Sequence, residues 1–130
     1  MKTFLFSYWR SIFVIIGILY LSFAPTSTFE PVPRFLHADK IVHIALYFVL
    51  TSMLIYDFSK KAKGEYRKAK LVLICLLFPI SLGGIIEIFQ EAFFKPRSAD
   101  CFDWLADIAG VILAYLFSLF FFKHTKTKAE

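Results

Sequence analysis

Apolar residues gather in four long runs along this chain, and shorter polar segments separate the runs. A helix needs roughly 20 apolar residues to cross a hydrocarbon core of roughly 30 Å. The pattern therefore predicts an all-α integral membrane bundle of four transmembrane helices, at about residues 4–24, 40–57, 70–90 and 103–122. No internal repeat is evident in the 130 residues, so we expect one membrane domain over 1–130.

The first apolar run has a second interpretation. Lys2, Arg10 and the small residues Ser22 and Ala24 also resemble a secretory signal with a small-x-small cleavage site. Pro25 would follow such a cut directly, where its ring and missing N–H fit a protease subsite poorly. We therefore expect this helix to be retained as the first membrane span.

Composition supports a membrane location. Hydrophobic residues make up 58% of the chain, and 17 residues are Phe. Ordinary soluble domains are roughly 45–50% apolar, and a soluble chain this small could not bury so much apolar surface. The net charge is +5, but the basic residues lie between or outside the apolar runs. This distribution is not that of a nucleic-acid-binding surface, so no nucleic-acid partner is expected.

The positions of the basic residues predict the orientation. We expect the middle loop to be a solvated segment over 57–70. With four spans, this loop and both termini lie on one side of the membrane, and eleven of the fifteen Lys and Arg residues fall on that side. Four fall on the other side. Because loops rich in Lys and Arg stay in the cytoplasm, we expect both termini to be cytoplasmic in a multi-pass protein of the plasma (inner) membrane.

Polar residues interrupt the apolar pattern in three segments, all at the extracytoplasmic ends of the predicted helices. Charged groups at membrane depth are costly and persist mainly for pairing, substrate contact or ion contact. Residues four apart, such as Asp103 and Asp107, project from one helix face. Three helices therefore bring polar faces to one layer, which predicts a functional or ligand-binding cluster of Lys40, His43, Glu87, Gln90, Arg97, Asp103 and Asp107.

Several of these residues also have purely structural interpretations. Asp100 is a natural N-cap for the last helix, and Asp103 can complete a capping-box arrangement. His43 and Asp107 can be hydrogen-bonded core groups. Arg97 can bind an anion beside a helix N-terminus, or it can be the counter-ion of a carboxylate.

Further features concern packing. Cys75 and Cys101 are expected to be free thiols, because helix ends on opposite sides of a bilayer keep them apart. Pro79 predicts a kink in the third helix. In the last helix a small residue recurs every four positions, at Ala106, Gly110 and Ala114. This spacing lets a neighbouring helix approach closely.

The order of the polar residues is that of a known family. The patterns are D-K-x-x-H-x-x-x-Y from Asp39 to Tyr47, E-x-x-Q from Glu87 to Gln90, and R-x-x-D-x-x-D-x-x-x-D-x-x-G from Arg97 to Gly110. On four hydrophobic spans they resemble the VanZ-like family. The resemblance implies a small bacterial membrane protein of the cell envelope. By position it carries over the family's motif residues, Lys40, His43, Glu87, Gln90, Arg97, Asp103 and Gly110.

The resemblance also sets limits. The best-known relative gives low-level resistance to the glycopeptide teicoplanin, which suggests a link to antibiotic resistance, but the family's biochemical activity is not established. Its members often have Asn at the position of Asp107. The carboxylate of Asp107 adds negative charge there.

Three functions fit the predicted layer, and whether the protein is an enzyme stays open. In the first, Lys40 and Arg97 bind an anionic lipid headgroup or a lipid-linked envelope precursor. In the second, the protein is a membrane-embedded hydrolase or transferase that uses acid–base chemistry or a divalent metal at His43, Glu87, Asp103 and Asp107, of which the first three are the candidate metal ligands. In the third, Glu87 and His43 relay protons in a small transporter, whose wall a homo-oligomer could complete. No cofactor other than such a metal is indicated.

Overall fold

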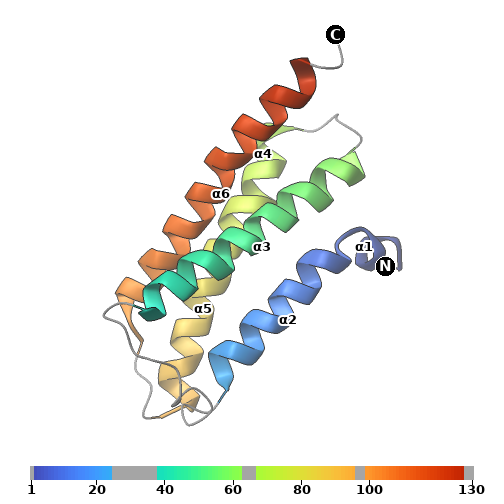
Figure 1. Cartoon of the computed structure of the whole chain (residues 1–130). Helices are drawn as coiled ribbons and strands as arrows, with labels where there is room; N and C mark the ends of the chain where they lie inside the picture. The colour runs from blue at the N-terminus through green and yellow to red at the C-terminus, as the bar shows by residue number, and fades with distance from the viewer. Residues whose placement is uncertain (1, 25–37, 63–66, 96–98, 128–130) are drawn as a thin grey trace.

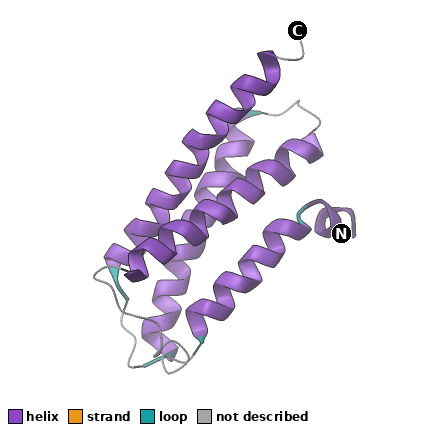
Figure 2. Ribbon diagram, in the orientation of Figure 1, coloured by secondary structure: helices purple, strands orange, loops and turns teal. Residues whose placement is uncertain are grey.

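Helices make up nearly all of the described chain. The computed structural model describes residues 2–24, 38–62, 67–95 and 99–127, with only the backbone described from 122 onward. These residues contain no strand (Figure 2). The elements in chain order are α1 (Lys2–Ser7), α2 (Trp9–Phe23), α3 (Ala38–Ala62), α4 (Lys68–Leu71), the π-helical segment η2 (Val72–Leu77), α5 (Phe78–Phe93) and α6 (Cys101–Thr127).

Three helical segments are long and apolar enough to cross a membrane: Ala38–Ala62, Lys68–Phe93 and Cys101–Phe121. Their outer faces carry large exposed apolar side chains such as Ile88 and Phe120, which suit contact with lipid. Helix α2 is also apolar, but its 15 residues span only about 22 Å at 1.5 Å per residue. The prediction of an all-α membrane protein is therefore confirmed with three candidate spans.

The predicted first helix, 4–24, is divided in the structure. The backbone leaves the helical conformation at Tyr8, where φ is −114° and ψ is 20°, and α2 begins at the next residue. The buried carboxylate of Asp57, on α3, accepts hydrogen bonds from the Ser11 backbone N–H (3.2 Å) and Oγ (2.9 Å). Ser11 is the third residue of α2, so Asp57 satisfies one of the free N–H groups of the new helix end. A contact between helices thus stabilises the break.

The second helix, predicted at 40–57, extends further at both ends in the structure. Helix α3 runs from Ala38 to Ala62, and Asp57 is only 1% exposed. The expectation that the solvated loop begins at residue 57 is therefore wrong. Asp57 points inward because α2 supplies its hydrogen-bond partners, and Lys60 and Lys61 suit the negative end of the helix dipole in the last turn.

The third run forms one continuous helical stretch from Lys68 to Phe93 with an irregular middle. Segment η2 lies directly before Pro79, which is in the first turn of α5. Pro79 has no backbone N–H, and its ring crowds the carbonyl of the residue four positions earlier, Cys75. The sequence predicted a kink at Pro79; the structure has a π-helical segment that ends two residues before Pro79, a local adjustment known from membrane helices that contain proline.

Small residues bring α3 and α6 close together. Ala106, Gly110 and Ala114 are all buried on one face of α6. A Cβ atom added to Gly110 would overlap the carbonyl oxygen of Ile44 and would lie 3.1 Å from the Phe48 backbone nitrogen. The close approach predicted from the four-residue spacing is confirmed.

The arrangement places four helix ends together. The first residues of α3 and α6 lie at the same end of the bundle as the last residues of α2 and α5 (Figure 1). Toward the middle of the bundle the core is apolar, with Tyr47, Leu50 and Val111 almost fully buried. The polar residues predicted to share one layer belong to these neighbouring ends, apart from Arg97, which lies outside the described residues.

Candidate functional site

Polar side chains from three helices meet where α3 and α6 begin and α5 ends. We call this group the polar cluster, and it consists of Lys40, His43, Glu87, Asp100, Asp103 and Asp107. Each member contacts at least one other member through a side-chain atom. Five of the seven residues expected in this layer are therefore joined by direct contacts: Lys40, His43, Glu87, Asp103 and Asp107.

His43 and Asp107 form the shortest contact in the cluster. The Nδ1 atom of His43 lies 2.8 Å from Oδ1 of Asp107. Asp107 is 1% exposed and reaches His43 from the second turn of α6. When Nδ1 carries the proton and donates to Asp107, the other ring nitrogen, Nε2, is left as an acceptor or metal ligand. Nε2 lies 4.0 Å from Oδ2 of Asp103.

Glu87 caps α6 from a neighbouring helix. The Asp100 side chain accepts the Phe102 backbone N–H at 2.9 Å, so Asp100 is an N-cap as predicted. In a capping box, Asp103 would accept the backbone N–H of Asp100. Glu87 Oε2 accepts that N–H instead, at 3.0 Å. This exchange leaves the Asp103 carboxylate directed at Lys40 and His43.

One oxygen of Glu87 lacks a hydrogen-bond partner. Glu87 is 5% exposed, and its Oε1 has no partner among the described residues. A buried polar atom without a partner is costly, by about 1–3 kcal/mol. In native proteins, buried polar atoms of this kind often contact a bound ion or a water molecule. Glu87 Oε1 is therefore suited to bind a cation.

Lys40 is engaged by two carboxylates. Its Nζ lies 3.3 Å from Asp103 Oδ1 and 3.5 Å from Asp100 Oδ2. It is therefore a counter-ion within the cluster. Four carboxylates, on Glu87, Asp100, Asp103 and Asp107, face this one lysine and one histidine.

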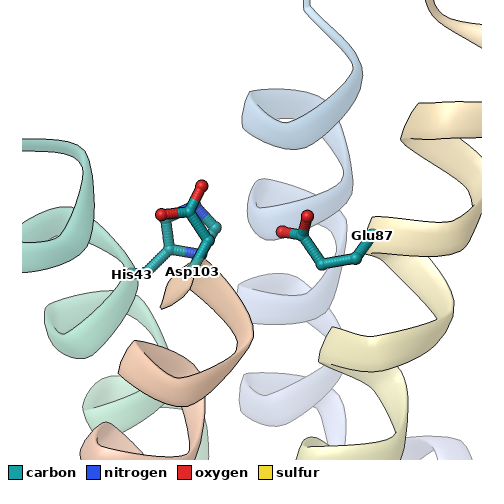
Figure 3. Close-up of side chains that lie close together, drawn as sticks. All are labelled: His43, Glu87 and Asp103. Carbon is teal, nitrogen blue, oxygen red and sulfur yellow. The ribbon is translucent and has the colours of Figure 1, made fainter. Parts of the chain in front are cut away.

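Three members of the cluster offer metal-ligand atoms close together. One atom each from His43, Glu87 and Asp103 lies within 4.8 Å of the other two. Figure 3 shows Asp103 beside the His43 ring and the Glu87 carboxyl pointing toward both from α5. These are the three residues predicted as candidate metal ligands. Ligands about 2.1 Å from a tetrahedral ion are about 3.4 Å apart, so on binding the ligand atoms would need to approach one another by at most about 1.4 Å.

The other predicted site residues are placed differently. Gln90 is buried, but its Nε2 donates to the backbone carbonyl of Ser22 at 2.8 Å, which ties α5 to the end of α2. The structure therefore gives Gln90 a positioning contact outside the cluster. Arg97 lies outside the described residues.

The structure adds residues that the sequence did not single out for the site. A Cβ atom on Gly83 would lie 3.3 Å from Cγ of Asp107 and 3.3 Å from Trp104. The Trp104 indole donates to the carbonyl of Ile80 at 2.9 Å and covers Gly84. Gly83 thus makes room for Asp107 between α5 and α6. The Gly83–Gly84 pair was the available sequence signal, since small residues mark close helix approach.

The chain is similar to a protein of the fungus Schizosaccharomyces pombe, described as uncharacterized protein C11E3.10. The two sequences are 30% identical over 122 residues, which is 91% of this chain and 67% of the fungal protein. No protein-family model matches the chain, and no solved structure matches it. The extent of the match means that this chain belongs to the family of the Schizosaccharomyces pombe protein C11E3.10.

Proposed function

We propose that this chain is a multi-pass membrane protein that binds a divalent metal ion in its polar cluster and uses the ion to hold an anionic lipid headgroup or lipid-linked precursor. The observation that carries the proposal is the meeting of His43, Glu87 and Asp103, whose ligand atoms lie within 4.8 Å of one another. The buried Glu87 oxygen without a hydrogen-bond partner supports it, because a metal ion would satisfy that atom.

The surroundings of His43 also support a metal ligand. Metal-binding histidines usually donate their second ring N–H to a carboxylate, which fixes the ring and raises its basicity. Asp107 stands in that relation to His43, at 2.8 Å. One imidazole and two carboxylates form a mixed N and O donor set, which fits Zn²⁺ or Mn²⁺.

The charges favour a metal-mediated contact over direct binding of an anion by Lys40. The Lys40 ammonium is held by Asp100 and Asp103, and the cluster contains four carboxylates in all. An anion approaching these carboxylates directly would be repelled, whereas a divalent ion would offset two of the negative charges and present a positive centre to the anion. Phosphate oxygens of a headgroup could then complete the coordination of the ion.

A membrane-embedded hydrolase or transferase is the second candidate. His43, Glu87 and Asp103 would leave one coordination position of a bound metal open, as in catalytic zinc sites, where the metal would supply an activated water molecule near neutral pH. The same donor set and the His43–Asp107 pair favour this candidate. Turnover of a lipid substrate would separate it from simple binding.

The membrane topology belongs to the same proposal. Helix α2, with α1, provides a fourth crossing, both termini lie in the cytoplasm, and the polar cluster lies at the outer end of a plasma-membrane bundle. An envelope role, and any link to glycopeptide (teicoplanin) resistance, rests on the resemblance to the VanZ-like family. The relative found is a fungal protein, so the bacterial setting of this proposal rests on the same resemblance.

Metal analysis of the purified full-length protein tests the proposal. Protein loaded with Zn²⁺ or Mn²⁺ and dialysed against a weak chelator is expected to retain stoichiometric metal, and Glu87→Gln is expected to lose it. Glu91→Gln is the matched control, because Glu91 is exposed one turn further along α5. Equal metal content in the three proteins, or none in any of them, would contradict the proposed site.

A second measurement tests the headgroup. Binding of a short-chain anionic lipid to the metal-loaded protein is compared with binding after strong chelation. The proposal expects affinity to fall on chelation and in Glu87→Gln, but not in Glu91→Gln. A protein that binds metal but shows no metal-dependent lipid affinity would keep the metal site and reject the headgroup.

A further inference from the structure

A second polar site lies at the other end of the bundle. There the turn between α1 and α2 meets the last turns of α3 (Figure 1). A cavity of about 300 Å³ lies at this junction, and the charged residues in its wall are Arg10, Asp57, Lys60 and Lys61. Asp57 and His43 are 14 residues apart on α3, or about 21 Å along the helix axis. The cavity is therefore separate from the polar cluster.

The cavity wall carries an excess of positive charge. Its carboxylate, Asp57, already accepts hydrogen bonds from Ser11 and from Arg10, whose Nη1 lies 3.3 Å from Oδ1. No ion pair within the described part of the chain includes Lys60 or Lys61. Two lysines therefore remain available to a negatively charged ligand.

Aromatic rings hold the cations in place. The Arg10 guanidinium lies 4.7 Å from the centroid of Trp9 and 5.2 Å from that of Tyr56, and Lys60 Nζ lies 5.7 Å from Tyr56. Lys61 Nζ lies 4.8 Å from the centroid of the Phe4 ring on α1. A cation over an aromatic face keeps its N–H donors free for an anion on the other side. Lys60 and Lys61 are thus positioned without being neutralised, whereas Arg10 is paired with Asp57.

The neighbouring side chains suit a membrane surface. Phe6 and Trp9 also line the cavity and are 78% and 55% exposed. Exposed aromatic residues beside basic residues are typical of the zone where lipid headgroups meet acyl chains. A headgroup phosphate could enter the cavity while its acyl chains lie along these rings. Free phosphate would gain nothing from them.

We propose that the cavity formed by Arg10, Lys60 and Lys61 binds the phosphate of an anionic lipid headgroup at the membrane surface nearest the α1–α2 turn. The ligand chemistry is a phosphate monoanion carried on a lipid. This site needs no metal ion, so its occupancy is independent of the polar cluster and of the function proposed for it.

The test uses purified full-length protein in a neutral detergent after strong chelation, so that the metal-dependent site proposed at the polar cluster does not contribute. Retention of dihexanoyl-phosphatidylglycerol is measured by native mass spectrometry at increasing lipid concentration, with dihexanoyl-phosphatidylcholine and inorganic phosphate as separate probes. Phosphatidylglycerol is expected to bind more tightly than either. The double variant Lys60→Gln/Lys61→Gln is expected to bind it about thirtyfold more weakly, the combined effect of two interfacial cations.

Matched variants distinguish lipid binding in the cavity from general attraction to basic residues on the surface. Lys68→Gln/Lys70→Gln removes two exposed cations of α4, which are not part of the cavity wall, and is expected to leave affinity unchanged. With the metal removed, Glu87→Gln and the unaltered protein should bind phosphatidylglycerol equally, which separates this site from a metal-dependent headgroup at the polar cluster. Equal weakening by both lysine pairs would overturn the proposal, and equally tight binding of inorganic phosphate would overturn its assignment to a lipid.

Discussion

His43 and Asp107 show how single residues acquire a role through one contact. Their 2.8 Å hydrogen bond orients the imidazole so that Nε2 faces the side of Asp103. An amide oxygen at this position could accept the same N–H. The carboxylate also carries a negative charge, which would stabilise a cation bound nearby.

Substitution of Asp107 should change metal affinity without removing a ligand. Asp107→Ala is expected to weaken metal binding about 10–100-fold, because residues that orient a metal-bound histidine have effects of that size. Asp107→Asn keeps the hydrogen-bond acceptor and should have a smaller effect. Competition with a fluorescent metal chelator gives both affinities. Unchanged affinity in Asp107→Ala would show that His43 needs no orientation by this residue.

At the scale of elements, two contacts determine how the helices fit. Asp57 satisfies the start of α2 from inside α3, and Gly110 lets α6 approach the backbone of α3. The second contact positions the site, because Lys40 and His43 on α3 meet Asp103 and Asp107 on α6. A small change in the distance between these helices would separate the polar side chains.

Replacement of Gly110 by Ala should therefore reduce stability. The added methyl group would overlap the Ile44 carbonyl, and overpacking of this kind typically costs about 1–3 kcal/mol. Gly17→Ala is the control, because a Cβ atom there has nothing within 4 Å and should leave stability unchanged or raise it by up to about 1 kcal/mol. Unfolding in detergent with increasing denaturant gives both values. Equal stability of the two variants would mean that α3 and α6 can separate without cost.

At the scale of the whole molecule, the bundle has two unlike ends. The polar cluster at one end is rich in carboxylates, whereas the cavity at the other end is rich in cations. Apolar residues such as Leu50 and Val111 fill the space between them. In the proposed orientation the basic end faces the cytoplasm, where membrane surfaces carry anionic lipids.

The two cysteines allow this orientation to be measured. Both are free thiols, as predicted, and Cys101 is exposed beside the polar cluster while Cys75 is buried in the core. A membrane-impermeant maleimide applied to intact cells is expected to label the protein, and Cys101→Ser should abolish the label while Cys75→Ser should not. Labelling that requires lysis would place the polar cluster on the cytoplasmic side.

Much of the architecture could be predicted from the sequence because it depends on local properties. The apolar runs indicated membrane helices, the spacing of Ala106, Gly110 and Ala114 indicated the close face of α6, and Asp100 was identified as an N-cap. The grouping of His43, Glu87 and Asp103 was also predicted, because each lies at the expected end of its helix.

Other features depended on which helices became neighbours. The sequence by itself determined that the chain forms apolar helices with polar residues at defined helix ends, because burial preference and helical spacing act within one segment. Only the tertiary structure decided that Asp57 is a buried partner of α2, that Glu87 caps α6 in place of Asp103, and that Lys40 is held by two carboxylates. These contacts join residues far apart in the chain, and they follow from the rotation and separation of packed helices, which local sequence does not specify.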